Sequence, residues 1–126
     1  DDKLLINELA PRVHNSGHWT QAGASVDQFE NHIRAVAGLP LAPAEVKNQS
    51  MMVNLIGVDV DYNWLSIKGL ELYWYRKEVR PGRKVGHLNA CSGDLDQLQS
   101  ILKSLSSMPE PYDQALAWLS ENLPTG

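Results

Sequence analysis

The sequence lacks several features that mark whole classes of proteins. It holds a single cysteine, Cys91, so a disulfide within the chain and a cysteine-based zinc site are excluded. No apolar run reaches the length that a membrane-spanning helix needs, and no membrane partner is expected. No glycine-rich phosphate loop of the Walker or Rossmann pattern occurs. The lone thiol favours a cytoplasmic location.

Positive charge is also scarce over the chain as a whole. The 126 residues carry 11 Lys and Arg against 15 Asp and Glu, which gives a formal net charge of -4. This balance excludes a generally basic nucleic-acid surface, so no nucleic-acid partner is expected. Because 43% of the residues are hydrophobic, a core can form. The chain opens on polar residues directly before the apolar run Leu4-Leu5-Ile6, and we expect a piece of a longer protein on this ground.

The first half of the chain predicts one strand and one helix. Residues 4–9 are short and apolar, as in a buried strand, and residues 10–24 are expected to form an ordered loop. A helix is predicted to start at Ser25, whose spacing to Gln28 is that of a capping box, and to end at Gly38. The apolar stripe of this helix consists of Val26, Phe29, Ile33 and Val36.

The second half predicts a small sheet followed by two helices. Strands are expected over residues 51–56, 70–75 and 85–90, and the last two should form a hairpin around a Pro-Gly turn. Amphipathic helices are expected over residues 95–105 and 112–122. This order of elements predicts an α+β fold with a small, mostly antiparallel sheet and flanking helices.

The densest polar cluster follows the predicted first strand. Asn7 and Glu8 offer oxygen atoms that suit a hard cation such as Mg²⁺, and Arg12 offers a planar fork for carboxylate, bicarbonate or phosphate. His14 and His18 can donate hydrogen bonds or relay protons near neutral pH. The same residue types also fit ordinary polar groups at a strand edge. The cluster therefore indicates an anion or metal–anion site and names no reaction.

A second cluster is basic and surrounds the predicted Pro-Gly turn. Its five cations lie within nine residues: Arg76, Lys77, Arg80, Arg83 and Lys84. His87 follows just beyond them. Backbone N–H groups at such a turn, together with these side chains, suit a phosphate monoester. A merely solvated basic turn is the alternative. The aromatic residues 73–75 are predicted to pack in the sheet.

Two runs stand out as motifs: residues 6–18 (INELAPRVHNSGH) and residues 80–87 (RPGRKVGH). Together with residues 28–41 and 52–57, they resemble in order the family of N5-carboxyaminoimidazole ribonucleotide synthetases in its bacterial form. Val13 departs from the pattern, since many relatives have proline there. The resemblance implies the last part of a three-part ATP-grasp fold.

That resemblance implies a division of the chain and a reaction. Residues 1–49 would end the ATP-grasp catalytic domain, and residues 50–126 would form a small C-terminal α+β domain. The family carboxylates aminoimidazole ribonucleotide with bicarbonate through carboxyphosphate, converting ATP to ADP and phosphate. The upstream nucleotide-binding parts are not in this sequence. We therefore expect the chain alone to be inactive and to expose an apolar face.

The resemblance also implies roles for the residues of the first motif. Glu8 would bind Mg²⁺ and, with Asn7 beside it, the ATP co-substrate. Arg12 and His14 would face the bicarbonate or carboxyphosphate, with Asn15 close by. We expect Glu8 and Arg12 to share one polar pocket, because a cation and a bicarbonate must lie close together for phosphoryl transfer.

The second motif would hold the ribonucleotide 5′-phosphate. Lys77 and Arg83 are expected to flank it near the His14 loop, with Lys84 or Arg80 as helpers. The full-length protein would be a homodimer. Two alternatives remain: the related ATP-grasp glycinamide ribonucleotide formyltransferase, and a non-catalytic module for ribonucleotide-phosphate binding or dimerisation.

Overall fold

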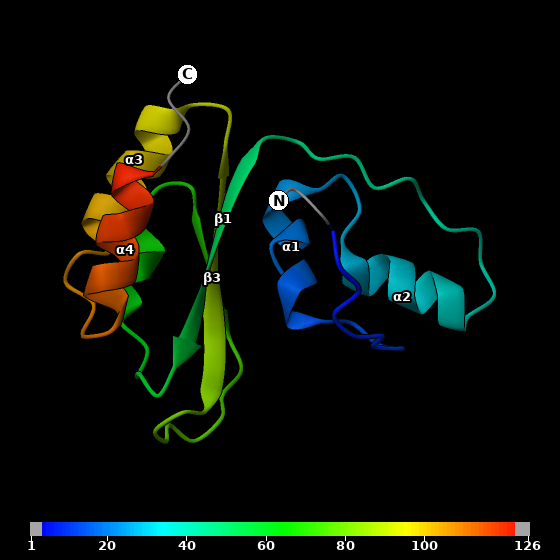
Figure 1. The fold of residues 1–126 in the computed structure, drawn as a ribbon, viewed down its shortest axis with the longest axis horizontal. Coiled ribbons are helices and arrows are strands. Elements are labelled where there is room, and N and C mark those ends of the chain that lie inside the picture. The colour runs from blue at the N-terminus through cyan, green and yellow to red at the C-terminus, as the bar shows by residue number, and fades with distance from the viewer. Residues whose placement is uncertain (1–3, 123–126) are drawn as a thin grey trace.

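The computed structural model describes residues 4–122, which form an α+β fold around one three-stranded antiparallel sheet (Figure 1). The elements in chain order are η1 (Asn15–Gly17), α1 (Thr20–Gly23), α2 (Gln28–Val36), β1 (Gln49–Ile56), η2 (Tyr62–Ser66), β2 (Leu70–Trp74), β3 (Lys84–Ser92), α3 (Leu95–Ser104) and α4 (Tyr112–Glu121). Helices α3 and α4 lie on one side of the sheet, and α1 and α2 lie on the other (Figure 1). No helix of the described part is long and apolar enough to cross a membrane.

The central strand β3 pairs with both neighbours, so its two faces organise the molecule. The strand order is β1-β3-β2, and both pairs are antiparallel. Leu88 lies opposite Val53 on β1 and Leu72 on β2, which makes one face apolar. His87 lies opposite Asn54 and Tyr73, which makes the other face polar and aromatic. Alternation along a strand therefore separates a packing face from a face available for chemistry.

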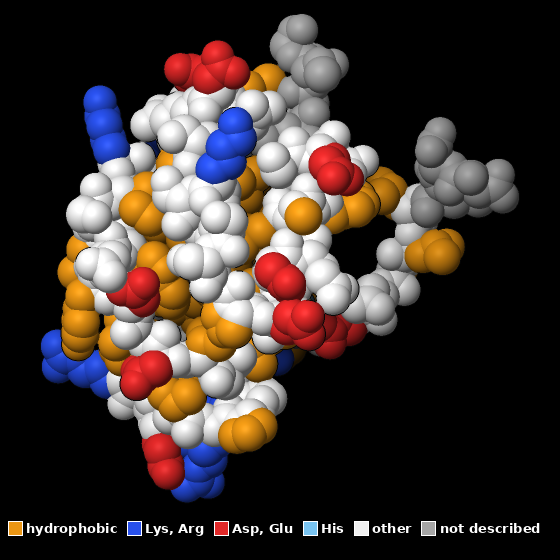
Figure 2. Space-filling model, turned by 90° about the vertical axis from the view of Figure 1, so that its left-hand side faces the viewer, with side chains coloured by type: hydrophobic (Ala, Val, Ile, Leu, Met, Phe, Trp, Pro, Cys, Tyr) orange, Lys and Arg blue, Asp and Glu red, His pale blue; other side chains and the backbone are white. Residues whose placement is uncertain are grey.

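The apolar face of the sheet is covered by α3 and α4. The Asp94 carboxylate caps α3 by accepting from the backbone N–H of Asp96, and the helix buries Leu98, Ile101 and Leu102. Viewed from this side, hydrophobic side chains form seams between polar ones, and charges of both signs are scattered over the surface (Figure 2). This face stabilises the fold and carries no concentrated charge.

Helix α4 is tied to the sheet by one side chain. The Tyr112 hydroxyl accepts from Ile56 N at 2.5 Å and donates to Ile56 O at 3.3 Å, at the end of β1. The ring itself belongs to the hydrophobic core. A buried aromatic ring with a satisfied hydroxyl fixes both the depth and the orientation of the helix.

The sheet, its hairpin and the two C-terminal helices confirm the prediction, and the elements of the first half differ from it. Residues 4–9 form no strand and are exposed, with Leu4 at 102% and Leu9 at 94%, so the predicted buried strand is wrong for this structure. A strand needs a hydrogen-bonded partner, and no described residue pairs with this segment. Residues 10–24, expected to lack regular elements, contain the short helices η1 and α1.

Helix α2 starts later than predicted. Its cap is Asp27, which accepts from the backbone N–H groups of Phe29 and Glu30 at 2.8 and 2.9 Å. Ser25 instead bonds a distant segment: its Oγ accepts from Glu45 N at 3.0 Å and donates to Pro43 O at 3.3 Å. The spacing of a capping box is therefore present in the sequence, but no capping box forms at Ser25.

The predicted apolar stripe of α2 is not buried in this structure. Ile33 is 64% exposed and Val36 is 74% exposed. The helix does end as predicted, with Gly38 in the left-handed region at φ +68. Exposed apolar side chains on α2 and on residues 4–9 agree with the expectation that this chain alone exposes an apolar face.

We predict that Tyr112→Phe lowers the free energy of unfolding by about 1–3 kcal/mol, because Ile56 N then loses its hydrogen-bond acceptor in a half-buried position. Urea denaturation of the 126-residue chain measures this change. Tyr62→Phe is the matched control, since Tyr62 is 72% exposed and should leave stability unchanged. Equal effects of the two substitutions would show that the hydroxyl of Tyr112 does not anchor α4.

Candidate functional site

The first motif forms a shallow polar pocket of about 330 Å³, lined by Asn7, Glu8, Ala10, His14 and Ser16. Glu8 Oε1 lies 2.9 Å from His14 Nε2. Ser16 lies against the other ring nitrogen, with its Oγ at 2.8 Å and its backbone N–H at 3.3 Å. Since the backbone N–H can only donate, His14 Nδ1 accepts and Nε2–H donates to the carboxylate.

Arg12 is not among the residues that line this pocket. Its side chain is exposed, and its Nη1 donates to the carbonyl of Val13 at 3.0 Å. The structure thus brings Asn7, Glu8 and His14 together and leaves Arg12 outside. The guanidinium is free to turn toward a ligand, because within residues 4–122 its side chain bonds only the backbone carbonyl of its neighbour on an exposed loop.

Gln28 holds the loop that carries His14. Its Oε1 accepts from His14 N at 2.9 Å, and its Nε2 donates to His14 O at 2.8 Å. The same Nε2 lies 2.6 Å from His18 Nδ1. Gly17 permits this approach, since a Cβ there would meet Gln28 Oε1 at 2.6 Å. The amide therefore fixes the backbone of the predicted active-site loop from the first residue of α2.

His87 is the centre of the polar face of the sheet. It is only 1% exposed, and the Gln21 Oε1 carbonyl lies 2.9 Å from its Nε2. A carbonyl only accepts, so Nε2 carries the proton and Nδ1 accepts from the Tyr75 hydroxyl at 2.6 Å. Tyr73 stacks on the ring with centroids 4.6 Å apart. Burial lowers the pKa of His87 to about 4, with Lys84 and His18 adding to the shift.

The basic turn meets the first motif through Lys84. Its Nζ donates to Asn15 Oδ1, across 69 positions of sequence. Lys77 Nζ and Lys84 Nζ lie 5.2 and 5.6 Å from the centroid of the Tyr75 ring. Burial and, to a smaller extent, the positive charge of Lys77 together lower the pKa of Lys84 to about 8. Two ammonium groups are thus gathered beside the His14 loop.

The other predicted phosphate ligands are arranged differently. Arg80 is paired with Glu78 at 2.6 Å on the surface, so its charge is partly compensated. Arg83 is exposed, and no hydrogen bond or ion pair of its side chain occurs within residues 4–122. Gly82 gives the turn its left-handed residue at φ +73. Of the four predicted ligands, Lys77 and Lys84 share one location, beside Tyr75.

Sequence reasoning missed four of the polar residues that organise this site: Gln21, Gln28, Tyr75 and His87. Tyr75 was assigned to sheet packing and His87 was noted only as a neighbour of the basic cluster. The alternation of side chains along a strand was the available signal. It places Tyr73 and Tyr75 on one face of the sheet, and Tyr73 pairs across the strands with His87 on that same face. Nothing in the local pattern points to the two glutamines.

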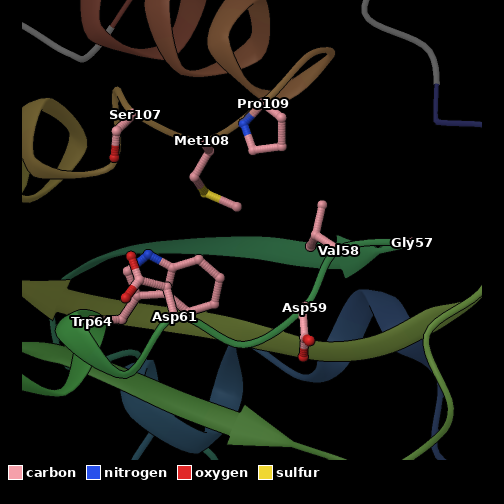
Figure 3. A pocket seen from close by; sticks show the side chains of 8 residues that line it. All are labelled: Gly57, Val58, Asp59, Asp61, Trp64, Ser107, Met108 and Pro109. Carbon is pink, nitrogen blue, oxygen red and sulfur yellow. The ribbon is translucent and has the colours of Figure 1, made fainter.

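A separate hollow of about 330 Å³ lies on the α3–α4 side of the sheet. Met108 points into it from the connection between these helices, opposite Trp64 and Val58 (Figure 3). Two carboxylates line this hollow, and both bond nearby backbone: Asp59 and Asp61 accept from the N–H groups of residues 60 and 63. None of the predicted site residues lies there.

Among residues 4–122, no group of three or more His, Cys, Asp or Glu side chains is placed to hold a metal ion. The oxygen atoms of Asn7 and Glu8 nevertheless suit a hard cation that takes its remaining ligands from a phosphate or water. One Glu8 oxygen is engaged by His14, and the other has no partner within the described part. The residues present therefore fit a partial Mg²⁺ site.

Comparison with protein families gives the class of the chain first. The ATP-grasp domain model matches residues 1–29. The model described as the phosphoribosylaminoimidazole carboxylase C-terminal domain matches residues 50–101. The ATP-grasp match thus contains the residues of the Glu8–His14 pocket, and the second match contains the basic turn.

Individual relatives agree with this class. An Escherichia coli N5-carboxyaminoimidazole ribonucleotide synthase is 57% identical over 116 residues, covering 91% of this chain and 33% of the relative. The Thermus thermophilus N5-carboxyaminoimidazole ribonucleotide synthetase structure is 52% identical with a TM-score of 0.77, covering 86% of this chain and 31% of that one. The chain belongs to the family of N5-carboxyaminoimidazole ribonucleotide synthases and spans about a third of the length of these curated relatives.

One further solved structure bears on ligands. The synthase of Aspergillus clavatus, solved in complex with ADP and 5-aminoimidazole ribonucleotide, is 28% identical with a TM-score of 0.63. The match covers 84% of this chain and 29% of that chain. The two ligands are those of that protein.

We predict that the stability of the chain falls between pH 7 and pH 5, by about 2 kcal/mol from His87 alone. An unfolded histidine takes up a proton near pH 6.5, whereas His87 stays neutral until about pH 4. The unfolded state therefore binds more protons in this window, and stability is lost as the pH falls. His18, whose pKa is also lowered by burial, acts in the same direction.

Urea denaturation at pH 7 and pH 5 measures this effect, with His87→Asn as the comparison. The variant removes the titrating ring and keeps an acceptor for Tyr75, so its stability should depend less on pH. An identical pH dependence in the two proteins would contradict the assignment of a buried neutral imidazole.

Proposed function

We propose that the protein carrying this chain is an ATP-dependent ligase of purine biosynthesis that carboxylates aminoimidazole ribonucleotide with bicarbonate. The observation that carries the proposal is the contact between the two motifs, in which Lys84 Nζ donates to Asn15 Oδ1. A pocket for a metal and phosphate thereby adjoins a pair of cations that suits a phosphate monoester. The reaction joins a carboxyl unit activated at the first site to the amine of a ribonucleotide held at the second.

In this proposal the first motif serves phosphoryl transfer. Bicarbonate attacks the γ-phosphate of ATP, ADP leaves, and carboxyphosphate forms; such transfers depend on positioning and charge neutralisation. Asn7 and Glu8 would supply oxygen ligands to Mg²⁺, which neutralises phosphate charge when bound. His14 keeps the Glu8 carboxylate in place through Nε2–H. Arg12 would turn toward the bicarbonate or carboxyphosphate from its exposed loop.

The basic turn would hold the 5′-phosphate of the ribonucleotide. The amino group of the ribonucleotide then attacks the carboxyl carbon of carboxyphosphate, the C–O bond to phosphate breaks, and inorganic phosphate leaves. Lys77 and Lys84 are supported for this role by their shared position over Tyr75. Asn15 would lie between phosphate and carboxylating centre, since it accepts from Lys84. Arg83 is exposed and available, whereas Arg80 is held by Glu78 and is the weakest of the four predicted ligands.

The division into residues 1–49 and 50–126 belongs to the same proposal. It is supported by the separate family matches to residues 1–29 and 50–101. A cytoplasmic homodimer is proposed for the whole protein, as the family resemblance implies. We expect the 126 residues alone to be inactive, because relatives of this family are about three times as long.

In the intact protein, one that includes the upstream part its relatives have, we predict that Lys77→Ala raises the KM for the ribonucleotide at least tenfold. Loss of a charged hydrogen bond to phosphate accounts for about 1.5–3 kcal/mol. The KM for ATP should change less than twofold. Steady-state kinetics with each substrate varied separately measures both constants.

The matched control is Lys103→Ala, which removes an exposed cation from α3 on the other side of the sheet. It should leave both constants unchanged. Equal increases in the KM values for ribonucleotide and ATP in Lys77→Ala would point to a general folding defect and contradict a phosphate role for the basic turn.

A further inference from the structure

The two ammonium groups of the proposed phosphate site are arranged around one aromatic ring. Lys77 lies on the exposed turn after β2, and Lys84 is the first residue of β3. Both lie within 6 Å of the centroid of the Tyr75 ring, at 5.2 and 5.6 Å. A ring face attracts cations at this range, so it reduces the repulsion that two adjacent ammonium groups otherwise feel. The position of the ring therefore sets the position of the cations.

The Tyr75 ring is in turn held in place by the hydrogen bond of its hydroxyl to His87. This group donates to His87 Nδ1 at 2.6 Å, and His87 cannot turn because Gln21 accepts from its Nε2 at 2.9 Å. Stacking of Tyr73 on the imidazole at an interplanar angle of 6° holds the plane of the ring. A flip of the imidazole would put Cδ2–H against the Tyr75 hydroxyl and Cε1–H against Gln21 Oε1, so both hydrogen bonds would be lost. The orientation of His87 Nδ1, which accepts from the Tyr75 hydroxyl, is therefore fixed.

We propose that Tyr75 and His87 are positioning residues of the ribonucleotide-phosphate site, acting through Lys77 and Lys84. The inference rests on the proposed function and adds residues that neither contact the reacting atoms nor belong to the predicted ligand set. It also assigns a part to Gln21, which lies in the segment matched by the ATP-grasp model and whose side chain bonds His87 in the sheet. The phosphate site is therefore built by both segments, although its cations come from one.

The test compares substitutions that separate the ring from its anchor, in the intact protein. Tyr75→Phe keeps the ring face and loses the hydrogen bond to His87. We expect the KM for the ribonucleotide to rise about three- to tenfold, the effect of one hydrogen bond. Tyr75→Leu also loses the ring face and should raise this KM further. The KM for ATP should change less than twofold in both variants, and Tyr62→Phe should change neither constant.

Substitution of His87 supplies a rescue arm. His87→Phe removes the acceptor for the Tyr75 hydroxyl and should reproduce the rise seen with Tyr75→Phe. His87→Asn places an amide oxygen close to the former Nδ1 and should restore most of the lost affinity. A merely structural histidine would give the opposite order, because phenylalanine preserves the buried ring better. Circular dichroism and melting temperature confirm that each variant is folded.

The outcomes separate this inference from the function on which it rests. If Lys77→Ala does not change the KM for the ribonucleotide, the phosphate site itself is misplaced and both proposals fail. If Lys77→Ala raises it while Tyr75→Phe, Tyr75→Leu and His87→Phe do not, the phosphate site stands and the positioning role is overturned. Equal effects on the KM for ATP would also overturn it.

Discussion

Burial of His87 as a neutral ring between Tyr75 and Gln21 is the constraint on which the rest of the site depends. An imidazole that is 1% exposed needs partners for both nitrogens, and it takes one from each segment of the chain. The Gln21 side chain holds α1 against the sheet, and the Tyr75 hydroxyl holds the strand that leads into the basic turn. The ring thus joins the two segments, alongside the hydrogen bonds from Lys84 to Asn15 and from Asn89 to His18.

This arrangement works because β3 has two different faces. Leu88 and its neighbours bury against α3 and α4, which supplies the hydrophobic stabilisation of the fold. His87 and Asn89 on the opposite face contact polar groups, and Asn89 Nδ2 donates to His18 O at 2.9 Å. The polar residues His87 and Asn89 thus lie on the central strand, which is paired on both sides. Loops anchored on such a strand can be polar without losing their position.

The sequence patterns predicted the β1, β2 and β3 strands and the α3 and α4 helices, because alternation and amphipathic spacing are local properties. The same reasoning failed at residues 4–9, where an apolar run indicates burial without saying which chain segment provides it. It failed again at Ser25, whose spacing to Gln28 fits a capping box although Asp27 forms the cap.

Those site residues that cluster within one short segment of the sequence could be predicted. Glu8, His14 and Lys77 could be selected from clustering and from motif resemblance. The bonds of Gln28 to His14 and of Gln21 to His87 span 14 and 66 positions, and no local period records them. Side chains that hold a site together across the chain are visible only once the fold brings them close.

A double-mutant cycle between Gln21 and His87 tests the central claim most directly. The free energy of unfolding is measured for the 126-residue chain, for Gln21→Ala, for His87→Asn and for the double variant. Because the two side chains share one buried hydrogen bond, a coupling energy of about 1 kcal/mol is expected. Additive effects of the two substitutions would show that the ATP-grasp segment and the sheet are not joined through this ring.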